Sequence, residues 1–253
     1  MTDRSSAVRR MGVTLAWRPE WPVAVIVVMA WVALIAIHAS SSMQGAHAAH
    51  VGAAAPTALL AAVGGWALVS WALMSVAMMV PVTLPAVRHV GLNSIRRRRR
   101  RAMALYAASY VAVWVAFGVL ALVLVAALRS TGPDERLLVL GTLVIAALWQ
   151  LTRWKRRAVV ACQRTVPLPP TGWRADAGCV RFGVRQAGRC VVSCGPLMLL
   201  MAVIGHGNLV VMAALTVGIV AERRTSIRGR LAVPVGGALA AAAVWTVLFS
   251  GAT

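Results

Sequence analysis

Sulfur-bearing side chains recur at helical spacing near position 190, and they are the residues best suited to chemistry. The four stand at i, i+4, i+8 and i+11: Cys190, Cys194, Met198 and Met201. At 100° per residue they fall within a stripe about 80° wide on one helix face. Thiolate and thioether sulfurs are the soft ligands that select Cu(I). This face therefore predicts a Cu(I) site, with ordinary apolar packing of methionine as the alternative.

Residues elsewhere could complete the ligand set. Met74 and Met78 are four residues apart on an earlier apolar segment. His206 lies in a short turn after the segment that carries the two cysteines. If the two segments run in opposite directions, Met78 lies at the depth of the cysteines. The expected metal ligands are Cys190, Cys194, Met198, Met201, Met74, Met78 and His206. A separate metal-collecting loop is a second hypothesis, built on His38, Met43, His47 and His50.

Several catalytic classes lack the residues they need. The chain has no GxxxxGK[ST] phosphate loop, and its six acidic residues all fall outside the centres of the apolar segments. The only lysine, Lys155, stands at the end of an apolar segment, which excludes retinal chemistry. Glu222 is expected to form an ion pair with Arg223, Arg224 or another arginine. We therefore expect no enzyme, no catalytic residue and no organic cofactor.

The elements that must position these residues are membrane helices. The chain is 60% hydrophobic and 13% charged, with a mean hydropathy of +0.78. Apolar blocks of roughly 18 residues or more predict membrane spans, because lipid satisfies no backbone polar group. We expect an all-α polytopic helical bundle, with a basic N-terminal segment at residues 1–20 and one transmembrane domain at 21–253. Helices are expected near residues 21–37, 57–80, 103–128, 137–152, 188–204, 208–222 and 231–249.

Details of these helices follow from local signals. The second is expected to stop at Pro81 and Pro85. The fifth and sixth are short and could form a tight hairpin or a re-entrant pair. The first, followed by small residues at 39–41, could also be a cleaved signal peptide, which would leave six spans.

The placement of basic residues predicts the orientation. Of 26 lysines and arginines, only Arg129 and Arg136 fall on the side opposite the rest. The positive-inside rule then places the N-terminus in the cytoplasm and the C-terminus outside, in a bacterial plasma membrane. Arginines 96–101 are expected to contact anionic lipids. Nucleic acid is excluded as a partner because no aromatic residues interleave with this run. The four cysteines lie on the cytoplasmic side, so we expect no disulfides, with Cys162 and Cys179 structural or incidental.

Three stretches resemble a known family, the predicted metal-binding integral membrane proteins called domain of unknown function 2182. Residues 71–81 are similar to its W-x-x-M-x-x-A-M-M-x-P motif, and residues 148–156 to its Y-Q-L-T-x-x-K-R motif. A third stretch, 183–222, keeps the order and spacing of Arg185, Cys190, Cys194, Leu197, Met198, Gly205, Asn208, Met212 and Glu222. The resemblance covers about residues 65–250. It implies a metal-binding membrane protein, with copper inferred from the ligand types.

The chain departs from the family pattern at four positions. Ser193 stands where the family's C-x-x-C-C motif has its middle cysteine, and Gln186 replaces a common histidine. Ala158 replaces a cysteine and Gly207 replaces a methionine. Each change removes a soft ligand, and His206 could compensate.

The expected function is that of a membrane copper-handling protein. It would bind Cu(I) through Cys and Met ligands between the second, fifth and sixth helices and pass the ion to a membrane partner. The alternative is a non-catalytic accessory subunit of a larger membrane metalloenzyme, such as a copper-dependent monooxygenase or oxidase. Paired glycines at 64–65 and 236–237 suit close helix packing in such a complex. A transporter for another solute is a third interpretation, disfavoured because the sequence shows no charged intramembrane site.

Overall fold

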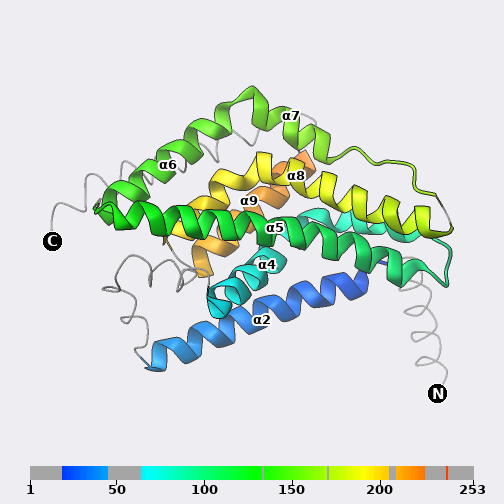
Figure 1. The fold of residues 1–253 in the computed structure, drawn as a ribbon, viewed down its shortest axis with the longest axis horizontal. Coiled ribbons are helices and arrows are strands. Elements are labelled where there is room, and N and C mark those ends of the chain that lie inside the picture. The colour runs from blue at the N-terminus through cyan, green and yellow to red at the C-terminus, as the bar shows by residue number, and fades with distance from the viewer. Residues whose placement is uncertain are drawn as a thin grey trace, which may run out of the picture.

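The chain folds into helices throughout the part that the computed structural model describes, residues 19–44, 64–132, 134–169, 171–204, 209–225 and 238. The helices are α2 (Trp21–Gln44), α4 (Gly65–Leu92), α5 (Arg99–Ser130), α6 (Glu135–Leu151), α7 (Arg153–Cys162), α8 (Trp173–Ile204) and α9 (Leu209–Thr225). In Figure 1, α2 lies along one side of the bundle and the bent α6–α7 pair along the other, with α5 and α8 between them. The expected all-helical fold class is confirmed.

Four of these helices, α2, α4, α5 and α8, are long and apolar enough to cross a membrane. Helices α6 and α7 reach that length only as a pair, and they are bent by 70° at Thr152. These apolar helices are compatible with a membrane protein. The expected count of seven spans stays a prediction, because residues 231–249 lie almost wholly outside the described residues.

The sequence predicted that the second helix stops at Pro81 and Pro85. Helix α4 instead continues through both prolines to Leu92. A proline inside a helix leaves the carbonyl four residues earlier without a backbone donor. For Pro81 that carbonyl belongs to Ala77, and the indole N–H of Trp31 on α2 donates to it at 3.0 Å. A side chain of a neighbouring helix thus replaces the missing backbone bond, and the helix persists.

Two other boundaries also differ from expectation. Helix α8 begins at Trp173, well before residue 188, and so is not short. Its early turns bury small and apolar residues at helical spacing, including Ala175, Cys179 and Phe182, and this burial extends the helix. The segment after Thr152, expected to be a loop, forms α7, because the Thr152 hydroxyl caps it by accepting from the Lys155 backbone N–H.

Small residues let the central helices approach closely. The ring of Trp71 on α4 occupies the space beside Gly118 of α5, and Gly183 of α8 packs against the Tyr106 carbonyl and the Ser109 side chain of α5. Such contacts are typical of membrane helices, whose interfaces favour residues without bulky side chains. They bring α4 and α8 close against α5.

Candidate metal centre

The expected sulfur ligands share one buried cluster. Met74 and Met78 of α4 lie in the same core as four residues of α8: Cys190, Cys194, Met198 and Met201. Each of the six is at most 1% exposed. The structure therefore places these six expected ligands in one buried cluster, whereas His206 lies outside the described residues. Across the described ranges, no three His, Cys, Asp or Glu side chains are grouped to hold a metal, so a site here would draw on methionine.

The metal-collecting loop receives no support from the part of the chain that the structure describes. His38 is an exposed residue of α2. The side chain of Met43, and both His47 and His50, fall outside the described part. This hypothesis stays a prediction.

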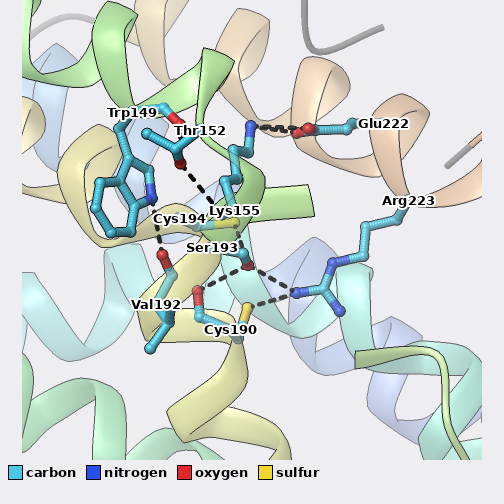
Figure 2. Close-up of polar contacts among 9 residues, drawn as sticks. All are labelled: Trp149, Thr152, Lys155, Cys190, Val192, Ser193, Cys194, Glu222 and Arg223. Carbon is cyan, nitrogen blue, oxygen red and sulfur yellow. Dashed lines mark hydrogen bonds and ion pairs between the residues drawn. The ribbon is translucent and has the colours of Figure 1, made fainter. Parts of the chain in front are cut away.

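Cys190 lies at the centre of a polar contact network within the apolar core. The hydroxyl of Tyr110 on α5 donates to its Sγ at 3.1 Å, and Nη2 of Arg223 on α9 donates to the same sulfur at 2.9 Å. Figure 2 shows the guanidinium directed at the sulfur. Arg223 brings a positive charge to Cys190 Sγ and Tyr110 adds a neutral O–H donor, an arrangement that supports a thiolate ligand in apolar surroundings.

Ser193 and Cys194 continue this network one turn later. The Ser193 hydroxyl donates to the Cys190 carbonyl at 3.0 Å and lies 3.3 Å from Cys194 Sγ. Arg223 Nη2 also reaches the Ser193 Oγ at 3.5 Å. Ser193 is thus a buried residue between the two thiols and the guanidinium (Figure 2). A soft side chain at this position would face the same space.

Several residues of this core were not predicted from the sequence to belong to the site. Cys162, Met79 and Met212 were not among the expected ligands, and all three are buried in the same cluster. Their residue types were a usable signal, because each carries a soft sulfur. Tyr110 and Arg223 carried no such signal, since their contacts depend on how three separate helices pack.

A buried ion pair lies beside the sulfur core. Lys155 Nζ of α7 and the carboxylate of Glu222 on α9 are 2.8 Å apart, with side-chain exposures of 0% and 9%. Among the described side chains, Glu222 thus pairs with Lys155 and not, as expected, with Arg223. The reason is that α7 forms a helix and directs Lys155 inward, as Figure 2 shows. The interior of the described bundle does hold charged groups.

Comparisons with known proteins point to copper. A search of curated proteins and a search of solved structures each gave no match. The model of a family described as PpoB2, a copper chaperone, matches residues 68–246. That range includes Cys190, Cys194 and the four expected methionines, so it agrees with the copper association inferred from soft ligands. Because the match covers well over half of the chain, this protein belongs to the PpoB2 copper chaperone family.

Proposed function

We propose that this protein is a membrane copper chaperone that holds Cu(I) on sulfur side chains between α4, α8 and α9. The observation that carries the proposal is the shared burial of Cys190 and Cys194 with Met78, Met198 and Met201 in one core cluster. Cu(I) is a soft ion, for which thiolates and thioethers are the preferred ligands. Membership of a copper chaperone family supports copper as the ion, and the buried core contains side chains that could bind it.

The contacts of the site suit a carrier better than an enzyme. No expected ligand is a carboxylate, and the donors around Cys190, from Tyr110 and Arg223, stabilise charge on the sulfur. A buried sulfur site keeps water away from the ion, and transfer then requires a partner protein to compete for the ligands. We infer a non-catalytic role in which the ion passes to a membrane partner.

The charge distribution supports a multi-pass orientation in a bacterial inner membrane. Arg88, Arg98 and Arg101 stand near one end of α4 and α5, whereas Arg129 and Arg136 stand at the other end of α5 and the start of α6. The end with more arginines would face the cytoplasm. Seven spans, a cytoplasmic N-terminus, an outer C-terminus and anionic lipid at the arginine-rich face complete the proposal.

Copper binding by cysteine variants tests the site. The full chain is purified in lipid nanodiscs, loaded with Cu(I), and assayed for bound copper after removal of free ion. We expect the Cys190→Ser/Cys194→Ser variant to lose the tightly bound copper of the wild type. Cys179→Ser is the matched control, because Cys179 is buried in a different cluster on the same helix. Equal copper in the wild type and the double variant would contradict the proposed site and favour an accessory role.

A further inference from the structure

A cavity of about 730 Å³ lies at the arginine-rich end of the bundle, between α2, α4, α8, α9 and the residues after α7. Its lining includes the exposed Arg88 and Arg164 and the buried Cys162 and Gln186. The cavity therefore leads from the protein surface to the core. Its volume is within the range of sites that bind small molecules, roughly 300–1,000 Å³.

The thiol in this cavity belongs to a residue that two helices hold in place. Gln186 of α8 donates to the carbonyl of Cys162, and Arg189 donates to that of Ala161 at 2.8 Å. From the other side, Gln163 donates to the Arg223 carbonyl at 2.7 Å, which ties the end of α7 to α9. Cys162 is thus fixed between the cavity and the sulfur core.

Arg223 connects the cavity to the copper site. It lines the cavity, donates to Cys190 Sγ at 2.9 Å, and also interacts with the thiol of Cys162. Within the described part of the chain, however, the three cysteines 162, 190 and 194 form no single metal-holding group. Cys162 is therefore a separate position on a path that continues to Cys190.

The charge of the lining indicates which ligand the cavity would accept. It carries three arginines, Arg88, Arg164 and Arg223, and one carboxylate, Glu20. Glu20 is 4.0 Å from Arg88, so one positive charge is partly balanced and the excess remains positive. A cavity lined by one sign of charge concentrates ligands of the other sign. An anionic ligand that also carries a soft metal matches both the arginines and the thiol.

We propose that this cavity is the copper entrance, where a small anionic thiol carrying Cu(I) docks and transfers the ion to Cys162 before it reaches Cys190 and Cys194. The proposal rests on the Cu(I) site proposed above. In the first exchange, the carrier's copper–sulfur bond breaks as the bond to Cys162 forms, and the Cys162 proton passes to the released carrier thiolate. The second exchange repeats this between Cys162 and Cys190. Copper stays Cu(I) throughout, so no redox partner is needed.

Loading kinetics test the role of Cys162. The full chain in nanodiscs is mixed with the complex of Cu(I) and glutathione, and copper transfer is followed to completion. Cys162→Ser should load at least tenfold more slowly and reach the wild-type copper content. Cys179→Ser should match the wild type in both respects. Loading of Cys162→Ser at the wild-type rate overturns the proposal, and so does a lower final content, which would make Cys162 a permanent ligand.

The charge of the carrier gives a second, independent arm. Arg164→Gln should slow loading from anionic glutathione–Cu(I) several-fold and leave loading from the cationic acetonitrile complex of Cu(I) unchanged. Arg153→Gln, an exposed arginine that does not line the cavity, is the control. Equal slowing with both carriers would contradict an anion-selective entrance. Failure of the copper site itself is distinguishable, because it is decided by the final copper content of the Cys190→Ser/Cys194→Ser variant.

Discussion

The indole N–H of Trp149 on α6 donates to the carbonyl of Val192 on α8 at 2.9 Å. Pro196, four residues after Val192, has no N–H and leaves that carbonyl without its helical partner. Trp31 makes the same substitution for Ala77, opposite Pro81. In an apolar bundle an unpaired carbonyl is costly, and at Pro81 and Pro196 a tryptophan of a neighbouring helix supplies the missing donor. The tryptophans hold α2 against α4 and α6 against α8.

This relationship predicts a coupling between Trp149 and Pro196. Trp149→Phe removes the donor and should lower the free energy of unfolding by about 0.5–2 kcal/mol, the range of hydrogen bonds between membrane helices, because lipid around the exposed Val192 offers its carbonyl no other donor. In a Pro196→Ala background the backbone N–H of residue 196 returns, and the same change should cost less. Denaturation in mild detergent measures both. Trp154→Phe, at a side chain that is 63% exposed, should shift stability by less than about 0.5 kcal/mol. An equal cost of Trp149→Phe in the two backgrounds would refute the coupling.

A second prediction concerns the close approach of α5 and α8. A Cβ atom at Gly183 would overlap the Ser109 hydroxyl and lie 2.6 Å from the Tyr106 carbonyl oxygen. Gly183→Ala should therefore force the helices apart and destabilise the protein by about 1–3 kcal/mol. Gly188→Ala, on the same helix with no atom within 4 Å of the new Cβ, should be neutral or stabilising by up to about 1 kcal/mol. Thermal unfolding monitored by circular dichroism compares them, and similar melting temperatures would contradict the packing argument.

The parts of this molecule that a sequence predicts are those set by long, regular patterns. The apolar blocks of α2, α5 and α6 predicted helices near the observed ranges, and the spacing of Cys190 and Cys194 predicted a single buried face. Helix α7 was missed because its charged start is typical of a loop, and only the 70° bend at Thr152 directs it inward. The pairing of Lys155 with Glu222 follows from that bend. Such contacts depend on how helices pack, which no local pattern encodes.

A third prediction follows from the burial of that ion pair. Glu222→Gln leaves the Lys155 ammonium without its counter-ion and should destabilise the protein by about 3–5 kcal/mol. Lys155→Met/Glu222→Leu replaces both charges with apolar groups and should recover most of this loss. The exposed pair Arg129–Glu135 provides the control, since Glu135→Gln should cost no more than about 1 kcal/mol. The prediction fails if the double variant is less stable than Glu222→Gln alone.

A fourth prediction concerns the position that lacks a soft ligand. Ser193 Oγ lies 3.3 Å from Cys194 Sγ and is buried beside Cys190, so Ser193→Cys would add a third thiol to the same space. A further soft ligand should strengthen Cu(I) binding by about tenfold or more, equivalent to about 1.4 kcal/mol. Competition with a chromogenic Cu(I) chelator measures the affinity of the purified full chain.

The neighbouring residue supplies the control for this gain. Val192 is 47% exposed and lies outside the buried core, so Val192→Cys adds a thiol to the same helix without adding it to the site. Its Cu(I) affinity should equal that of the wild type. An equal gain from both variants would mean that any added thiol binds copper. No gain from Ser193→Cys would mean that the space beside Cys194 does not hold the ion, and the ligands would then have to lie farther along the methionine face.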